Sequence, residues 1–341
     1  MMPGFGAGTN ENRSGGIDIQ QIVYSFLKMR EQNRKNQNFL CFLLLIIGTL
    51  LLTVPAAADT NPFRIAGDYN GFILGDVTQI GGLSEGALAL KGDSDLRNNV
   101  SIGTLLPPGG NSMGMGMVVG GNSTWVKMAG SSGQVIEGDM HVGGIIFHEE
   151  VSILNGTLCG PLCGPNYPIN FTAEEEYLKS LSAYWANLSA TPGTTVVATG
   201  IGATRKLNLT GSNLTLNIFH VNFTQWDDRR QVNLTIPPNS SVIINVNGTT
   251  DSLVYPGKYN MTLSCNGNCS GCAWRKVIWN FYNMTDISIG NIDWKGTVLA
   301  PHADYHYKNA WVEGLLIAKS LDTTDSAGLT ELRCYSFNGD V

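Results

Sequence analysis

The residues whose types and spacing come closest to a reactive site form the run His302, Ala303, Asp304, Tyr305 and His306. Alternate residues of a β-strand point to the same face. Positions 302, 304 and 306 could therefore offer two imidazoles and one carboxylate to a transition-metal ion. The same alternation is typical of an ordinary exposed polar strand. We take the ordinary strand as the better interpretation and predict no metal site.

The other polar groups have structural explanations. Residues 174–176 are three glutamates that fit the first turn of a helix, where the helix dipole favours negative charge. Residues 227–230 are typical of a solvated turn, and His141 and His220 have no convincing partner. No nucleophile elbow, phosphate loop or dinucleotide fingerprint is present, and the Gly-Ser-Ser-Gly run at 130–133 fits none of them. The sequence therefore predicts no enzyme and no cofactor.

Six of the seven cysteines follow the apolar leader: Cys159, Cys163, Cys265, Cys269, Cys272 and Cys334. An even number in an exported chain predicts three disulfides, for which fifteen pairings are possible. The C-x3-C-x2-C spacing of the triplet in 265–272 also suits an iron–sulfur cluster or zinc, but in an oxidising compartment we interpret that match as accidental. A bridge from Cys159 or Cys163 to this triplet would tie the two halves of the chain together.

Composition limits the class of protein. Lys and Arg number 21 against 27 Asp and Glu, for a net charge of −6, so the basic surface that binds nucleic acid is absent. Hydrophobic residues make up 43% and charged residues 14%, and the 41 glycines show no collagen-like period. A folded, turn-rich β-protein is the expectation.

The first 58 residues have the pattern of a secretory signal. Residues 39–58 carry no charge, follow three basic residues and end in three alanines. Because the strongly apolar part, 39–54, is short for a bilayer, we favour cleavage after Ala58 over a retained membrane anchor. Translation from Met29 would give a signal of conventional length. We therefore divide the chain into 1–58 and one ectodomain, 59–341, whose 16 basic and 24 acidic residues leave it acidic.

Asn-X-Ser/Thr sequons mark the ectodomain as a glycoprotein. Chance would supply about four, since Ser and Thr make up roughly one residue in six. The fourteen sequon asparagines are Asn99, Asn122, Asn155, Asn170, Asn187, Asn208, Asn213, Asn222, Asn233, Asn239, Asn247, Asn260, Asn268 and Asn283. Incidental sequons in a Thr-rich β-protein are the alternative. Around 207–210, 214–218 and 232–236, apolar residues alternate with polar ones, so the apolar set is predicted to face a core and the asparagines to face water.

Internal repeats predict the fold. Residues 72–76, 89–93, 118–122 and 135–139 each place Gly and then Asp or Asn after a short apolar strand, with an interval of 17 between the first two and between the last two. Gly and Asp or Asn tolerate the backbone of a sharp corner, so each repeat suits one coil of a β-solenoid. Unrelated hairpins with Gly-Asp turns are the alternative. Two C-terminal segments, 296–300 and 314–318, should likewise form two stacked coils.

One helix is predicted in the middle of the chain. Thr172 should cap it, and Glu175 should complete a capping box. An apolar stripe at helical spacing should pack along the solenoid: Tyr177, Leu178, Leu181, Tyr184, Trp185 and Leu188. The predicted fold class is mainly β, a β-solenoid (β-helix) domain with one flanking α-helix.

Several of these segments together resemble a known family. They are residues 69–76, 85–89, 118–122, 277–281, 296–301 and 314–321. They are similar to the choice-of-anchor A domain family of microbial surface proteins, over roughly 64–339. This resemblance implies an extracellular, non-catalytic, adhesin-like domain that is usually followed by a surface anchor, and because the chain stops at Val341 we expect none. The rungs also resemble, more distantly, microbial ice-binding β-helix proteins.

The sequence therefore predicts a secreted, heavily N-glycosylated structural or adhesive protein of the extracellular surface. We expect it to assemble head to tail into a fibre or coat through the open ends of the solenoid, with residues 59–66 as a linking arm. Its partners would be itself, extracellular matrix or surface glycans. Nucleic acid is excluded, and a membrane is involved only if the leader is retained. An ice-binding protein and a polysaccharide-acting enzyme are the alternatives.

Overall fold

The computed structural model describes residues 61–126, 133–149, 151–161, 169–201, 204–222, 231–248, 251–253, 260–265, 273–324, 330–333 and 336–341. The leader, four of the six cysteines, Asn268 and the predicted turn at 227–230 lie outside these residues, as do the side chains of Asn260 and Cys265. The predictions made for them stay predictions. Within the described part of the chain, no helix is both long and apolar enough to span a membrane.

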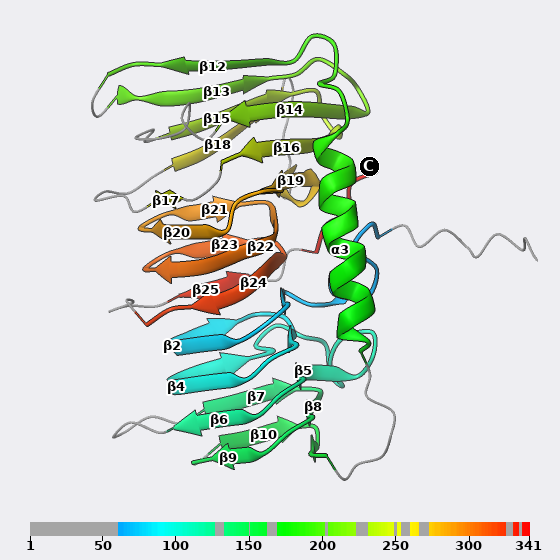
Figure 1. Ribbon diagram of the computed structural model, residues 1–341, viewed down its shortest axis with the longest axis vertical. Coiled ribbons are helices and arrows are strands. Elements are labelled where there is room, and N and C mark those ends of the chain that lie inside the picture. The colour runs from blue at the N-terminus through cyan, green and yellow to red at the C-terminus, as the bar shows by residue number, and fades with distance from the viewer. Residues whose placement is uncertain are drawn as a thin grey trace, which may run out of the picture. The chain divides into compact units, whose positions relative to one another are not determined.

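Parallel strands form three ladders (Figure 1). The first ladder is, in spatial order, β14 (Leu216–Asn222), β16 (Ser241–Asn247), β19 (Val277–Asn280), β22 (Thr297–Lys308), β24 (Leu316–Asp322), β1 (Gly71–Ile73), β3 (Leu88–Leu90), β5 (Met115–Val119), β8 (Asp139–Val142) and β11 (Leu158–Cys159). The second is β17 (Asp251–Leu253), β20 (Asp286–Gly290), β22, β24, β2 (Val77–Ser84), β4 (Ser94–Ile102), β6 (Ser123–Val126) and β9 (Ile146–His148). The third is β21 (Asp293–Lys295), β23 (Trp311–Glu313), β25 (Glu331–Arg333), β2, β4, β7 (Gly133–Glu137) and β10 (Val151–Asn155).

Long strands turn from one ladder into the next, so the sheet curls into coils. β2 and β4 belong to the second and third ladders, and β22 and β24 to the first and second. With one α-helix among the described residues, the predicted fold class is confirmed as a mainly β, curled parallel sheet.

The order of the coils in space differs from their order in the sequence. From β1 the chain coils toward β11, and α3 (Phe171–Ala186) then runs back along the first ladder (Figure 1). A second sheet of β12 (Thr195–Thr199), β13 (Lys206–Thr210), β15 (Gln231–Ile236) and β18 (Asn260–Cys265) follows, with β12 antiparallel to β13. From β14 onward, each later coil lies closer to β1, until β24 pairs with β1. The two halves of the chain thus meet at a seam between β24 and β1.

A buried asparagine holds this seam. The Nδ2 of Asn70 donates to the carbonyl of Gly314 at 2.9 Å and to that of Arg333 at 2.7 Å, while its Oδ1 accepts from the Gly86 backbone N–H at 3.1 Å. One side chain therefore joins the first N-terminal coil to the last C-terminal ones.

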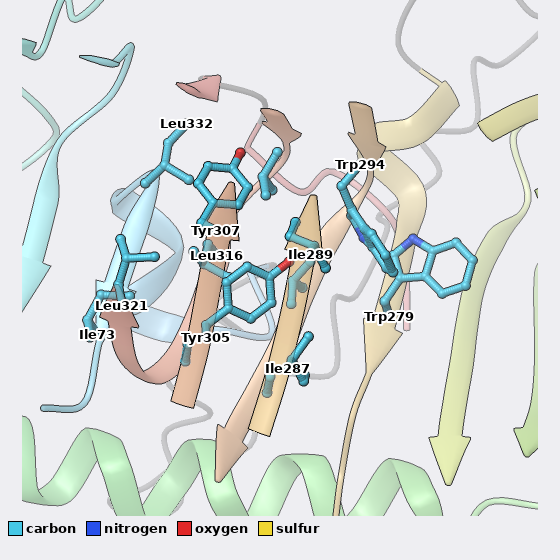
Figure 2. Packing of buried hydrophobic residues seen from close by; sticks show 14 of the residues in the cluster. Ile73, Trp279, Ile287, Ile289, Trp294, Tyr305, Tyr307, Leu316, Leu321 and Leu332 are labelled. Atoms are coloured by element: carbon cyan, nitrogen blue, oxygen red, sulfur yellow. The ribbon is translucent and has the colours of Figure 1, made fainter. Parts of the chain in front are cut away.

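The core has two layers. Inside the coils, aromatic and aliphatic side chains fill the space, and Figure 2 shows part of this cluster around Trp279, Trp294, Tyr305 and Tyr307. A second layer lies between α3 and the outer side of the first ladder. Strands of the first ladder such as β16 and β19 are buried on both sides, which explains why apolar residues follow one another in 242–244 and 277–279 instead of alternating with polar ones.

The predicted repeats are coils for three of the four N-terminal segments. The Gly-Asp corners stack, and each side-chain oxygen accepts the backbone N–H of the next coil: Asp76 from Asp93 at 2.8 Å, Asp93 from Asn122 at 2.6 Å, and Asn122 from Ile145 at 2.8 Å.

The fourth segment, 135–139, does not belong to this register. Its β7 lies in the third ladder, and the strand that pairs with Val118 and Val119 is β8. The 17-residue interval predicted the wrong register for this segment, because Gly-Asp turns occur at more than one corner of a coil. The C-terminal repeat is confirmed, since Val298 pairs with Leu316 and Ala300 with Ala318.

The predicted helix is confirmed, with a different cap, although Tyr184 of its predicted apolar stripe is 62% exposed and does not pack on the sheet. Asn170, not Thr172, caps α3, accepting from the Ala173 backbone N–H at 3.2 Å. Glu175 forms ion pairs with Lys91 and Lys179, both at 2.5 Å, instead of completing a capping box. The prediction failed because Thr172 already lies in the first turn.

The predicted linking arm is also wrong in its described part, residues 61–66. The 3-10 helix η1 (Arg64–Asp68) follows Phe63, and Phe63 and Ala66 are buried in the layer beneath α3. The Phe63 ring meets the rings of Trp185 and Phe337 edge to face, each at 5.7 Å between centroids. The apolar residues of this segment pack into the domain, so they are not available as an arm.

Candidate functional surface

The predicted metal run is divided by a bend in β22. Ala303, Tyr305 and Tyr307 point inward and the residues between them outward, as the strand period requires. The register shifts between Ala300 and Asp304 as the strand passes from the first ladder to the second. Asp304 and His306 therefore lie on the second ladder, whereas His302 lies near α3.

The surroundings of these three side chains differ accordingly. Burial, and next the positive charge of Lys179, lower the pKa of His302. Asp304 accepts from Lys319 at 2.8 Å and from Ser320 at 2.6 Å, and although burial opposes ionisation these bonds lower its pKa. Among the described residues no group of three His, Cys, Asp or Glu side chains could hold a metal ion.

The outer side of the second ladder, which we call the second face, carries a row of aligned side chains. Pairing of the strands places one outward residue of each coil beside the next: Ser288, His306, Asp322, Thr78, Asp95, Thr124 and Phe147. Neighbouring members stand about 4.8 Å apart, the spacing of hydrogen-bonded strands. Hydroxyl, carboxylate and imidazole groups alternate along this row.

Several charges of the second face are already paired. His306 Nε2 lies 3.4 Å from an Asp286 carboxylate oxygen and its Nδ1 lies 3.8 Å from Asp322. Asp95 binds the Arg97 guanidinium with contacts of 2.5 and 3.0 Å. The face is therefore polar and mixed in charge rather than uniformly acidic.

The outer side of the third ladder, the third face, has a tighter ionic network. Glu313 pairs with Lys295 and with Arg333, and Arg333 also pairs with Glu331 at 3.2 Å. The Arg333 guanidinium lies over the Trp311 ring, 4.3 Å from its centroid.

The sequon asparagines differ from the other asparagines in the exposure of their side chains. Of the twelve whose side chains are described, none is buried: nine are exposed, and Asn208, Asn233 and Asn283 are half-buried. The fully buried asparagines of the described chain all fall outside sequons: Asn70, Asn217, Asn245 and Asn280.

The sequons are also unevenly placed. None of the residues paired in the second ladder is a sequon asparagine. The first ladder includes two, Asn222 and Asn247, which pair with each other and are exposed, and the third includes Asn155, which pairs with Glu137. The paired residues of the second face thus include no sequon, and Asn99 lies at the bulge of β4 between the second and third ladders.

One chain of hydrogen-bonded side chains was not predicted from the sequence. Inside the coils Ser94 donates to Ser123 at 2.9 Å, and Ser123 Oγ lies 2.9 Å from His148 Nε2. Both serines are buried, so a substrate could not reach Ser123 as a nucleophile. The three residues lie 25 or more positions apart in sequence, and only the stacking of coils brings them together.

His141 and His220, predicted to be structural, occupy the ladders. His141 lies in β8 and His220 in β14, where the ring of His220 reaches the Leu188 carbonyl at 2.8 Å. Glu174 lies in the first turn of α3 as predicted. Cys159 is disulfide-bonded. Its partner is not among the side chains described, so the predicted pairings stay predictions.

The arrangement of ladders and helix has a match among known families. Residues 62–330 match the family described as "Putative Ice-binding-like adhesive domain". The chain belongs to this family. The expected likeness to adhesive and ice-binding-like proteins is confirmed in this coarser form, and a surface or extracellular location suits an adhesive domain.

Solved structures similar to this ice-binding-like adhesive domain include an ice-binding protein from an Antarctic biological consortium, at 14% identity, a TM-score of 0.37 and coverage of 79% of this chain and 86% of that one. Another comes from the Antarctic ascomycete Antarctomyces psychrotrophicus, at 11% identity, a TM-score of 0.38 and coverage of 81% and 98%. A glycosylated ice-binding protein from an Arctic yeast matches at 9% identity, a TM-score of 0.35 and coverage of 80% and 92%. No curated protein matches the chain.

Proposed function

We propose that this protein is a secreted, N-glycosylated adhesive domain of the extracellular surface that binds its target through the second face and catalyses no reaction. The observation that carries the proposal is the placement of the sequons. They avoid every buried asparagine position and every residue paired in the second ladder, although Asn99 of β4 lies at the bulge just beyond it, as expected if glycans cover mainly the other surfaces. A bulky hydrated glycan needs an exposed attachment site and blocks the surface around it.

Further support comes from the sequence. The leader pattern in 1–58 favours export, and the resemblance to the choice-of-anchor A domains of microbial surfaces favours adhesion. Membership of an adhesive domain family agrees with both.

The chemistry of the second face suits a surface glycan. Hydroxyl groups of a polysaccharide can donate to carboxylates such as Asp322 and accept from hydroxyls such as Thr78 and Thr124. The regular spacing of the row offers such contacts repeatedly along an extended polymer. Because the ectodomain is acidic, a neutral glycan suits it better than a polyanion.

The two alternatives find less support. Ice binding requires regular rows of Thr or similar small residues. The row on the second face instead contains large side chains such as those of His306 and Phe147. A glycoside hydrolase needs a general acid whose pKa is raised. Asp304 lies in an ion pair with Lys319 that lowers its pKa, which is the opposite requirement.

Self-association is the remaining part of the proposed function. Coils whose edge strands lack partners invite further strands, so copies of the domain can join at an open end and form larger surface assemblies.

A new sequon on each face tests the adhesive role. Thr78→Asn with Ile80→Thr would place a glycan on the second face, and Gln134→Asn with Ile136→Thr would place one on the third face, in both cases replacing outward residues. The ectodomain is secreted from a eukaryotic host, site occupancy is measured by mass spectrometry, and binding to immobilised neutral polysaccharides is compared.

We expect the second-face glycan to abolish binding and the third-face glycan to leave it unchanged. Enzymatic removal of the glycans should restore binding to the first variant. Equal binding by both variants, or unmodified Asn208 and Asn233 in the native protein, would overturn the proposal.

A further inference from the structure

We infer that two copies of this domain join through the same end of the solenoid, the terminal coil formed by β9, β10 and β11, to give a twofold dimer rather than a head-to-tail filament. The inference rests on the proposed self-association and concerns its geometry. It depends on three features: an open edge, an apolar surface at that edge, and an opposite end that finishes in an antiparallel strand.

The open edge is the last coil in each of the three ladders. β9 pairs with β6, β10 with β7, and β11 with β8, and among the described strands nothing pairs with their other edges. Backbone N–H and C=O groups of an unpaired edge bind another strand readily.

The core is also open at this end. The inward residues Ile146, Val151 and Ile153 are only partly buried. Val135, which pairs with Ile153 one coil earlier, is fully buried. The terminal coil therefore exposes the side of its core that the next coil would cover.

Exposed apolar side chains gather on the same coil. Ile145 is 75% exposed, Phe147 55%, Leu154 53% and Leu158 44%. Taking about 200 Å² for a fully exposed large side chain, these four present on the order of 450 Å² in each copy. Two copies with their strand edges reach the roughly 1,000 Å² that a specific interface needs.

The opposite end finishes in a different way. The outer edge of β14 is met by Thr191, whose backbone N–H donates to the Ile218 carbonyl and whose Oγ1 accepts from the Ile218 N–H. β12 is the outermost strand of the second sheet and runs antiparallel to β13, and Val197 on it is 48% exposed. The stack of parallel coils therefore ends in an antiparallel strand, which does not offer the parallel edge that a head-to-tail copy would need.

Sequons reinforce the difference between the ends. Asn208 Nδ2 lies 3.0 Å from Thr199 Oγ1, so a glycan on Asn208 would stand beside β12. Asn233, which donates to Asn208 Oδ1, adds another sequon to the same sheet. At the open end, Asn155 directs its Nδ2 to Glu137 on the preceding coil at 2.6 Å, away from the edge.

A second copy fits the open edge by symmetry. A twofold axis through the middle of β10 would set β10 against β10 of the other copy in antiparallel pairing, and β9 against β11 of the other copy. Such a contact forms a closed dimer, because the open edge of each copy is paired with that of the other and no open edge of the terminal coil remains for a third copy. The expected product is a dimer with the ends that carry β12 outward.

The test compares charges placed at the two ends. Leu154→Lys and Leu158→Lys alter exposed side chains of the terminal coil that lie outside the second face, and Ile201→Lys is the matched control near the opposite end, where Ile201 is also exposed. The glycosylated ectodomain and each variant are studied by analytical ultracentrifugation over a wide concentration range, and circular dichroism confirms that each variant is folded.

We expect a dimer for the native ectodomain and for Ile201→Lys, and a dissociation constant raised at least tenfold in Leu154→Lys and Leu158→Lys. A native protein that stays monomeric, a dimer lost only in Ile201→Lys, or open-ended oligomers would each overturn the inference. Polysaccharide binding is measured on the same samples, so that a monomer that still adheres refutes the dimer and leaves the adhesive proposal standing.

Discussion

Ser182 on α3 donates a 2.6 Å hydrogen bond to Oδ1 of Asn280 on β19, in the fully buried layer between helix and sheet. Asn280 in turn donates to the Ser182 carbonyl at 2.8 Å and to Asn245 Oδ1 at 2.7 Å, and Asn245 donates to the Trp185 carbonyl at 2.7 Å. The apolar residues around them would tolerate some sliding of the helix, whereas these bonds have one geometry. The network therefore fixes where α3 lies on the first ladder.

Removal of this network should destabilise the domain. In Asn280→Leu the Ser182 hydroxyl and the Asn245 side chain lose buried partners, so we expect a loss of about 2–4 kcal/mol of unfolding free energy. Ser180→Ala, which removes an exposed hydroxyl from the same helix, is the control and should change stability by less than about 0.5 kcal/mol. Urea denaturation followed by circular dichroism measures both, and equal effects would contradict the assigned role.

Two neighbouring tyrosines should respond in opposite ways to the loss of a hydroxyl. Tyr305 and Tyr307 are both buried on β22 (Figure 2), but the Tyr307 hydroxyl donates to the Glu331 carbonyl at 2.8 Å, whereas that of Tyr305 has no partner among the residues that the structure describes. A buried hydroxyl without a hydrogen bond costs about 1–3 kcal/mol.

Tyr305→Phe should therefore raise the unfolding free energy by about 1 kcal/mol, and Tyr307→Phe should lower it by about the same amount. Thermal and chemical denaturation of the two variants measure the difference. A destabilised Tyr305→Phe protein would show that its hydroxyl is satisfied in solution.

The Gly-Asp corners should not accept alanine. A Cβ on Gly121 would lie 2.2 Å from Asp93 Oδ1 and 2.8 Å from the Gly92 carbonyl oxygen, so Gly121→Ala must displace the bond that joins two coils. We expect a loss of about 2 kcal/mol or more. Gly290→Ala is the control, because a Cβ there makes only ordinary contacts of 3.4 Å or longer. Similar melting temperatures for the two variants would contradict this explanation of the repeat.

His148 should make the terminal coils sensitive to acid. Burial lowers the pKa of His148 below its usual value of 6.5. The unfolded chain therefore binds this proton at a higher pH than the folded one, and the stability associated with neutral His148 is complete above pH 6.5 and lost as the pH falls below it. Ser94 donates to Ser123, which leaves the Ser123 hydroxyl hydrogen for the neutral His148 Nε2.

The measurement is the unfolding free energy at pH 7.5 and pH 5.5 for the native protein, His148→Gln and the exposed control His220→Gln. His148→Gln should lose less stability on acidification than the native protein, while His220→Gln should follow the native protein. An unchanged pH dependence in His148→Gln would show that the imidazole is not the group responsible.

Much of the fold could be predicted because its signals are local. The stripe from Tyr177 to Leu188 has the helical period, and α3 forms there with Leu178 and Trp185 buried. The alternation in 207–210 and 232–236 became β13 and β15. The prediction for 214–218 was wrong, since Leu214 is 77% exposed and Asn217 is fully buried. There Asn213 binds the backbone of Thr215 and Leu216 in a turn, so β14 begins only at Leu216.

The candidate surface was less predictable. A sequence of outward residues on one strand can be read, but which residues of other strands stand beside them depends on the register of pairing. His306 lies between Asp286 and Asp322, which neither its own run nor any motif indicated. The sequons could be counted from the sequence, but their absence from the paired residues of the second ladder emerges only when the ladders are assembled.

The amino-acid sequence by itself determined the class of the protein: a mainly β chain with stacked coils and one flanking helix. Periods of 2, 3.6 and about 17 residues record how neighbouring side chains face a core. Only the tertiary structure decided the order of the coils, including the seam where Asn70 binds Gly314, 244 residues away. Backbone hydrogen bonds of a parallel ladder suit any strand equally, so the choice of partner is made by buried side chains such as Asn70, whose polar atoms must all find partners at once.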